Sequence, residues 1–226
     1  LSQQRAVWDL YMQNFRKHRI SPYLPQTYSP IKFNLVGQNY TYDFTDFDAA
    51  MERYLDEFNF SSFNWNEERS GSLVTLGGYG RFSPGYRQLY TKLMPPIMSH
   101  LREKGWLDKA YSYWFDEPLP KHYPFVEEGM QLLQEAAPGL RRMLTIYPDP
   151  PLYNRVEIWC PIYVISIYNL TFSRWAERQQ NEEEMWWYVA SSPYAPIPNN
   201  FTDHPALYPR MRSWMAEKFG ITGELY

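Results

Sequence analysis

Residues 110–118 read AYSYWFDEP, an apolar and aromatic run that ends in two adjacent acids and a proline. A short run of this kind is typical of a β-strand, because aromatic residues favour strands and Pro118 cannot continue one. The sequence therefore predicts a strand over residues 110–115, with Asp116 and Glu117 directly beyond its carboxyl end.

Helices and strands alternate on both sides of this run. Helices are predicted over residues 4–17, 43–58, 85–104, 124–136, 171–183 and 205–219, and six more strands near residues 18, 60, 141, 156, 185 and 222. Residues 22–42, which include Pro22, Pro25 and Pro30, are predicted to form a long loop, and residues 67–84 a glycine-rich excursion. Strands that alternate with helices of this length indicate an α/β sheet with parallel pairing.

The strand count favours an incomplete (β/α)8 TIM-barrel-like fold with about seven strands. Eight strands close such a barrel, which usually needs about 250 residues, and this chain has 226. A doubly wound sheet would also fit seven strands, but the glycines at positions 77, 78 and 80 lack the spacing and the lysine of a nucleotide-binding turn. We expect residues 1–226 to form one barrel domain that is a fragment of a larger chain, because residues 223–226 stop partway into the last strand.

Composition excludes several classes of function. Twenty-two Lys and Arg against 25 Asp and Glu give a net charge of −3, which is not the basic footprint of a nucleic-acid-binding protein. No apolar run reaches the ~18 residues of a membrane span. The four histidines and Cys160 lack the spacing of metal ligands, so we expect neither a metal nor another cofactor.

The acid pair carries the most concentrated chemistry. In parallel α/β barrels the active site lies at the carboxyl ends of the strands, where Asp116 and Glu117 are expected. Two carboxyl groups can divide the roles of acid and anion, as sugar chemistry requires. The residues leave a structural alternative open, in which Asp116 caps the following helix and Pro118 shapes a turn.

Aromatic and polar residues at predicted strand ends form a second group of candidates. The apolar faces of sugar rings stack on indole and phenol rings, and amide and guanidinium groups hydrogen-bond hydroxyls. Any single ring among them could instead fill the core. The candidate substrate-binding residues are Arg19, Asn64, Trp65, Trp159, Trp187 and Tyr188.

Four blocks in this order resemble the catalytic domain of glycoside hydrolase family 123. They are YSYWFDEP at 111–118, EEGMQLLQEAAPGLRRMLT at 127–145, VEIWCPIY at 156–163 and EMWWYVASSPY at 184–194. The matching pieces span roughly residues 10–226, and the strongest block covers 106–161. The resemblance implies a (β/α)8 catalytic barrel, usually preceded by a β-sandwich domain that these residues lack, and β-N-acetylgalactosaminidase activity.

The resemblance also implies retaining, substrate-assisted hydrolysis of a terminal β-linked N-acetylhexosamine. The 2-acetamido oxygen of the substrate attacks the anomeric carbon, while Asp116 orients the acetamido N–H. Glu117 protonates the leaving oxygen and later activates water. Because adjacent strand residues point to opposite faces, this pair needs a turn at the strand end to converge.

The implied partner is a glycan on a glycolipid, oligosaccharide or glycoprotein, and the implied location is secreted or periplasmic. Two alternatives remain open. One is a carbohydrate-binding or scaffold barrel without activity, and the other is a retaining glycosidase with a different sugar preference and a distant carboxylate nucleophile.

Overall fold

The computed structural model describes residues 2–37, 39–65, 75–163 and 172–226. Its contacts divide the chain into two compact units, one of residues 1–113 and 132–140 and the other of residues 114–131 and 141–226. Strand β6 and helix α4 each contribute residues to both units.

The first unit contains three α-helices and most of the short strands of the described chain. The helices are α1 (Ser2–His18), α2 (Thr45–Met51) and α3 (Pro84–Glu103), with the shorter turns η1 (Pro25–Tyr28), η2 (Glu52–Glu57) and η3 (Leu107–Lys109). The strands are β1 (Lys32–Val36), β2 (Asn39–Asp43), β3 (Phe63–Asn64), β4 (Thr75–Leu76), β5 (Tyr79–Gly80) and β6 (Ala110–Phe115).

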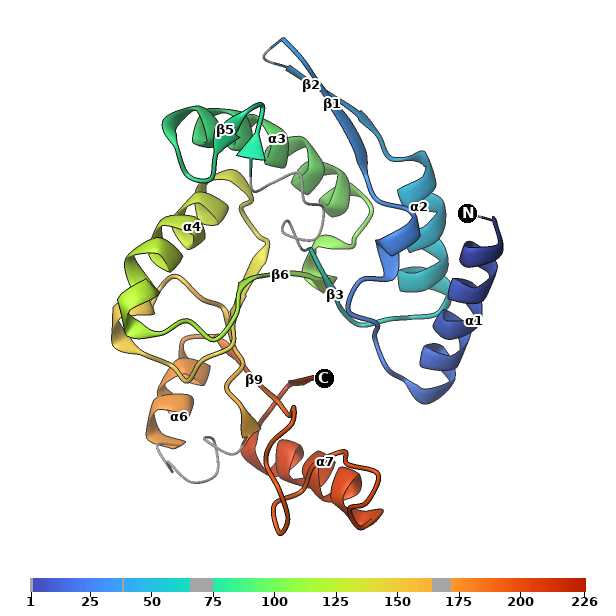
Figure 1. The fold of residues 1–226 in the computed structure, drawn as a ribbon, viewed down its shortest axis with the longest axis vertical. Coiled ribbons are helices and arrows are strands. Elements are labelled where there is room, and N and C mark those ends of the chain that lie inside the picture. Colours follow the sequence, from blue (N-terminus) through green and yellow to red (C-terminus); the bar gives the residue numbers. More distant parts are fainter. Residues whose placement is uncertain (1, 38, 66–74, 164–171) are drawn as a thin grey trace. The chain divides into compact units, whose positions relative to one another are not determined.

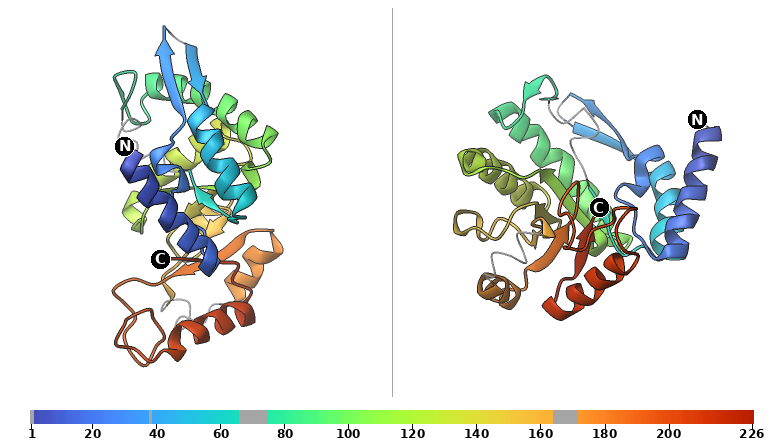
Figure 2. Two further views of the ribbon diagram at one scale, coloured as in Figure 1. Left: turned by 90° about the vertical axis from the view of Figure 1, so that its right-hand side faces the viewer. Right: turned by 60° about the horizontal axis from the view of Figure 1, so that its bottom comes forward.

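The second unit begins at the end of β6 and alternates helices with strands. Its helices are η4 (Pro120–His122), α4 (Tyr123–Ala136), η5 (Pro150–Leu152), α6 (Phe172–Gln180) and α7 (Leu207–Phe219). Its strands are β7 (Arg141–Leu144), β8 (Ile158–Trp159), β9 (Glu184–Tyr188) and β10 (Gly223–Leu225). Figures 1 and 2 show α6 and α7 on one side of β9 and β10.

Within the described residues, six strands form one sheet in the order β10-β9-β8-β7-β6-β3. The pairs β3–β6, β7–β8, β8–β9 and β9–β10 are parallel. This spatial order follows the chain order without reversal, whereas a doubly wound sheet reverses direction at a switch point. The fold is therefore α/β of the incomplete TIM-barrel type, which confirms the predicted fold class.

The prediction of a strand near residue 18 is wrong. Helix α1 continues to His18, and Arg19 follows it with a left-handed φ of 56°. The chain still reaches β3 a few residues later, because the Asn64 N–H donates to the Tyr23 carbonyl at 2.9 Å. A single bond of this kind places the segment beside β3 without building a ladder.

The prediction of a long loop over residues 22–42 is also wrong, because its second half forms a hairpin. Strands β1 and β2 pair antiparallel, with Val36 opposite Asn39, and extend as a ribbon beyond α2 (Figure 1). Gly37 takes a φ of 66°, which the two-residue turns of tight hairpins require. Of the predicted excursion over residues 67–84, residues 67–74 lie outside the described chain and residues 75–80 form the β4–β5 hairpin.

The central strands of the second unit are buried on both faces. Met143, Leu144, Ile158, Trp159 and Met185 have no exposed surface. Parallel strands covered on both faces read as largely apolar runs, which explains why 185–190 (MWWYVA) was recognisable in the sequence, whereas 141–145 (RRMLT) and 156–160 (VEIWC) combine apolar residues with charged ones. Among the described residues, no helix combines the length and apolar character that crossing a bilayer requires.

Candidate active site

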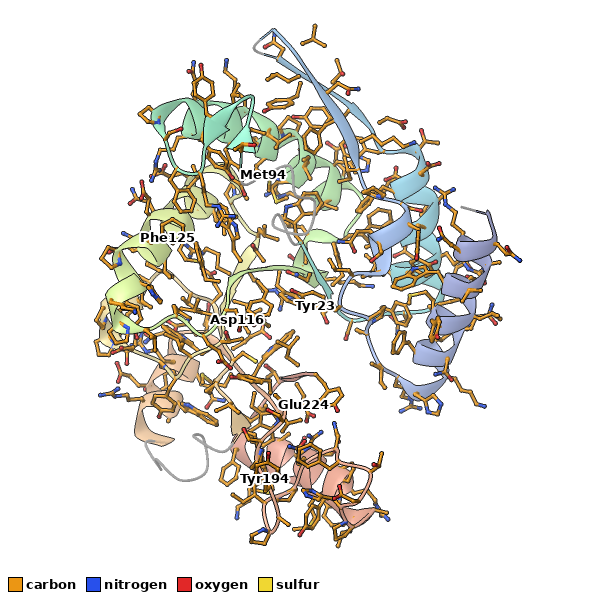
Figure 3. All side chains as sticks on the ribbon, viewed as in Figure 1. Tyr23, Met94, Asp116, Phe125, Tyr194 and Glu224 are labelled. Carbon is orange, nitrogen blue, oxygen red and sulfur yellow. The ribbon has the colours of Figure 1, made fainter. Side chains whose placement is uncertain are left out.

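Strand β6 carries the acid pair from the core to the surface. Its residues are buried except for the half-buried Tyr113, and Asp116 and Glu117, which follow directly, are exposed. Figure 3 labels Asp116 at this end of the strand. The ring of Phe115, the last strand residue, packs edge-on against Phe125 of α4 with centroids 5.7 Å apart. The pair therefore follows a strand end that is anchored to the neighbouring helix.

A turn at Glu117 breaks the alternation of the strand. Glu117 has a φ of 40°, in the left-handed region that residues other than glycine seldom adopt. Such a conformation persists only where surrounding contacts hold it, and it clusters at functional sites. The turn that convergence of Asp116 and Glu117 requires is therefore present at Glu117 itself.

Thr145, the residue after β7, contacts both members of the pair. Its hydroxyl Oγ1 donates to Oδ1 of Asp116 at 2.9 Å and accepts the backbone N–H of Glu117 at 2.7 Å. The side chain of Thr145 is buried, with 4% of its surface exposed. One hydroxyl on the neighbouring strand thus binds the side chain of one acid and the backbone of the other.

Tyr188, at the end of β9, provides the third contribution. Its phenol O–H donates to Oε1 of Glu117, and its ring is half-buried. Burial raises the pKa of the Tyr188 phenol, and the bond to Glu117 and the charges of both acids raise it further. Tyr188 therefore remains a neutral hydrogen-bond donor at physiological pH. Thr145, which follows β7, and Tyr188, the last residue of β9, thus both contact the acid pair that follows β6.

Two predicted sugar-binding rings lie in the core instead. Trp159 and Trp187 are completely buried. Their indole N–H groups donate to Glu183 at 2.5 Å and to Glu224 at 3.3 Å. A ring without exposed surface has no face to offer a sugar, so the alternative of core packing describes both residues. The apolar residues of β8 and β9 do not by themselves show which ring faces the core and which faces a pocket.

The other three candidates belong to the first compact unit. Arg19 is exposed after α1, and the Oδ1 atom of the buried Asn64 accepts the backbone N–H of Tyr113 at 2.9 Å. The Nδ2 atom of Asn64 and the indole nitrogen of Trp65 are buried without a hydrogen-bond partner in the described chain. A substrate-binding role for these three residues stays a prediction.

Sequence reasoning missed Thr145, although a signal was available. Thr145 is the last residue of RRMLT, the predicted strand that follows β6 along the chain. Neighbouring parallel strands end at the same edge of a sheet, so a polar residue closing the next strand can reach an acid closing this one.

Other features of the described residues do not suggest catalysis. They contain no group of three or more side chains arranged to hold a metal ion. A groove of about 680 Å³ runs along α1, lined by residues such as Trp8, Tyr11 and Tyr28, and has no acid in its lining. The acid pair remains the candidate site.

A parallel α/β sheet of the barrel type, with paired acids following the carboxyl end of one strand, is the arrangement in which barrel enzymes place acid–base chemistry. A family model described as the catalytic domain of glycoside hydrolase 123 matches residues 6–226. The chain therefore belongs to glycoside hydrolase family 123, which confirms the resemblance.

Solved structures agree on the fold. The chain is similar to a family 123 glycoside hydrolase from Clostridium perfringens, described in a study of glycolipid glycan hydrolysis, with 15% identity and a TM-score of 0.65. The match covers 99% of this chain and 44% of that protein, so this chain spans less than half of that protein's length. No curated protein sequence matches this chain.

Proposed function

We propose that this chain hydrolyses a terminal β-linked N-acetylhexosamine with retention of configuration, and that the preferred sugar is N-acetylgalactosamine. The observation that carries the proposal is the turned acid pair, in which Asp116 and Glu117 have separate hydrogen-bond partners at one strand end. Membership of glycoside hydrolase family 123 supports the hydrolase class. The related clostridial enzyme, studied for glycolipid glycan hydrolysis, supports a glycan substrate.

In the proposed first step the substrate supplies the nucleophile. Its acetamido carbonyl oxygen forms a bond to the anomeric carbon as the glycosidic C–O bond breaks, and Glu117 gives its proton to the leaving oxygen. Asp116 accepts a hydrogen bond from the acetamido N–H and offsets the positive charge that develops on the oxazoline ring.

In the proposed second step Glu117 takes a proton from water, and the oxygen of that water attacks the anomeric carbon. The bond from the acetamido oxygen to that carbon breaks, so two inversions give net retention. Tyr188 contributes by orienting the Glu117 carboxyl through its O–H donor. No step needs a metal or a redox cofactor.

The glycan could be part of a glycolipid, an oligosaccharide or a glycoprotein, and a secreted or periplasmic location belongs to the same proposal. Two functional alternatives need to be distinguished. A retaining glycosidase of different specificity would need a separate carboxylate nucleophile. Asp149, in the loop after β7, is such a carboxylate, although its Oδ2 accepts a bond from the Tyr123 hydroxyl at 2.7 Å. A binding module would bind glycans without turnover.

A panel of nitrophenyl β-glycosides tests the proposal. The set varies only the configuration at C4 and the presence of the 2-acetamido group. We expect turnover of the N-acetylgalactosaminide, less of the N-acetylglucosaminide and none of the plain hexosides. Turnover of plain hexosides together with failure on both N-acetyl sugars would contradict the proposal, and glycan binding without any turnover would favour the binding module.

Inhibition by a thiazoline that mimics the oxazoline separates the two enzymatic mechanisms. We expect tight competitive inhibition, because the site is complementary to the cyclised intermediate. Asp149→Asn is the matched control, and it should retain both turnover and inhibition. Loss of turnover in that variant, with no inhibition of the wild type, would identify a protein nucleophile instead.

A further inference from the structure

We propose that Thr145 is a positioning residue that holds Asp116 and Glu117 in their reactive arrangement. The inference rests on the proposed function, because it assigns Thr145 a role in the chemistry of that same pair. The hydroxyl of Thr145 both donates to the Asp116 carboxylate and accepts the Glu117 N–H, at 2.9 and 2.7 Å. A hydroxyl is the side-chain group that can serve as donor and acceptor through a single atom.

The position of Thr145 is itself well defined by the fold. It follows Leu144, which is fully buried and pairs with Trp159 of β8. The Leu144 carbonyl accepts the Cys160 N–H at 2.9 Å, which extends the pairing to the end of the strand. Threonine is branched at Cβ, so its χ1 torsion has fewer accessible values than that of serine. The hydroxyl is therefore presented from a buried strand at a restricted angle.

The backbone of Glu117 explains why such a contact matters. A left-handed φ of 40° is unfavourable for a residue with a side chain, so the turn needs a compensating interaction. The Glu117 N–H finds its acceptor at Thr145 only while the turn is formed. Without that acceptor, relaxation of the turn would move the Glu117 carboxyl away from its partner Tyr188.

Two substitutions separate the hydroxyl from the shape of the side chain. Thr145→Val keeps the volume and removes the hydroxyl, whereas Thr145→Ser keeps the hydroxyl. For an N-acetylhexosaminide, we expect Thr145→Val to lower kcat about 10- to 100-fold with KM within about threefold, the scale of one hydrogen bond to a charged group. Thr145→Ser should restore kcat to within about threefold of the wild type.

The matched control is Thr222→Val. Thr222 precedes β10, at the amino end of a strand, and its hydroxyl also donates to a carboxylate, Oε2 of Glu184, at 3.3 Å. This variant removes the same kind of bond at the opposite end of a strand, and we expect its kcat to match that of the wild type. Thermal unfolding of all variants tests that they are folded, and Thr145→Ala replaces Thr145→Val if the latter does not fold.

Amide hydrogen exchange tests the inference without reference to activity. In the NMR spectrum of the ¹⁵N-labelled chain, the Glu117 amide should exchange faster in Thr145→Val than in the wild type, and Thr145→Ser should preserve its protection. Unchanged kcat and unchanged exchange in Thr145→Val would overturn the inference. If the wild type hydrolyses no glycoside of the panel, the proposed function fails by itself, and the exchange of the Glu117 amide alone decides whether Thr145 holds the turn.

Discussion

Asp116 and Glu117 are neighbours in the chain, yet each has its own hydrogen-bond donor. Thr145 donates to the Asp116 carboxylate, and Tyr188 donates to the Glu117 carboxyl. Because the two carboxyl groups accept from different donors, one can stabilise a charge while the other transfers a proton. At the scale of single residues, these contacts lead to different expectations for the two acids.

Glu117→Gln should lower kcat for an unactivated N-acetylhexosaminide about 10²- to 10⁴-fold, the usual contribution of general acid–base catalysis. The amide keeps the shape of the side chain and cannot give up a proton in the same way. The loss should shrink for a dinitrophenyl glycoside, because that leaving group needs little protonation. Wild-type turnover of the unactivated substrate by this variant would exclude Glu117 as the acid.

Asp116→Asn should lower kcat about 10²-fold, since it removes the negative charge that faces the developing oxazolinium. It should also weaken thiazoline binding more than Glu117→Gln does. Calorimetric titration of both variants measures this difference. Equal affinity of the two variants for the thiazoline would mean that Asp116 does not face the acetamido group.

At the scale of elements, helix α3 accommodates two prolines with the help of the β1–β2 hairpin. Pro95 and Pro96 lie inside the helix and have no N–H to donate to the carbonyls four residues earlier, at Thr91 and Lys92. The Tyr42 hydroxyl of β2 donates to the Leu93 carbonyl at 2.9 Å and lies 3.4 Å from that of Lys92. The hairpin thus brings a hydroxyl donor to carbonyls of the helical turn that precedes the two prolines.

Tyr42→Phe should lower the free energy of unfolding by about 1 kcal/mol, the net value of one hydrogen bond of this kind. Burial raises the pKa of Tyr42 to about 12, so the hydroxyl stays protonated and the effect should be constant from pH 5 to 9. Urea denaturation provides the measurement. Tyr79→Phe, in a tyrosine with 51% of its surface exposed, serves as the control and should leave the midpoint unchanged.

Across the molecule, the two units differ in the direction in which the pKa values of carboxyl groups are shifted. In the first unit, hydrogen bonds from Arg53 lower the pKa of Asp9, and hydrogen bonding to Lys32 lowers that of Asp46. In the second unit, burial raises the pKa of Glu183. A carboxyl group whose pKa is lowered in the folded state stabilises the protein at pH values above its ordinary pKa, and this stabilisation is lost as the pH falls through the lowered pKa. A carboxyl group whose pKa is raised has the opposite effect on stability.

Acidification from pH 6 to pH 3 should therefore lower the stability of the first unit through Asp9 and Asp46, whose ordinary pKa is 3.8. Asp9→Asn should reduce this pH dependence, and 1 M salt should weaken it, because these side chains are partly exposed. Urea unfolding of wild type and variant at both pH values gives the comparison. An identical pH dependence in Asp9→Asn would show that the Arg53 pair contributes nothing.

The predicted core strands at residues 110–115 and 185–190 agree with the structure because burial on both faces leaves a largely apolar signal. The β1–β2 hairpin was missed because its residues are largely exposed and alternate weakly. The expected strand at residue 18 failed because the helix extended through it. Trp159 and Trp187 were expected to line a sugar pocket but are fully buried, because a strand pattern does not reveal which face a neighbouring element covers.

The α/β class, the family and the position of the acid pair after a strand could be read from the sequence, since an apolar run and a strand-end motif are local properties. The residues that surround the pair could not, because they come from distant parts of the chain. Thr145 and Tyr188 lie 28 and 71 positions from Glu117 along the chain, and parallel strand pairing brings them to it. The turn at Glu117 likewise depends on that assembly, because its backbone conformation is unfavourable until the neighbouring strand supplies an acceptor.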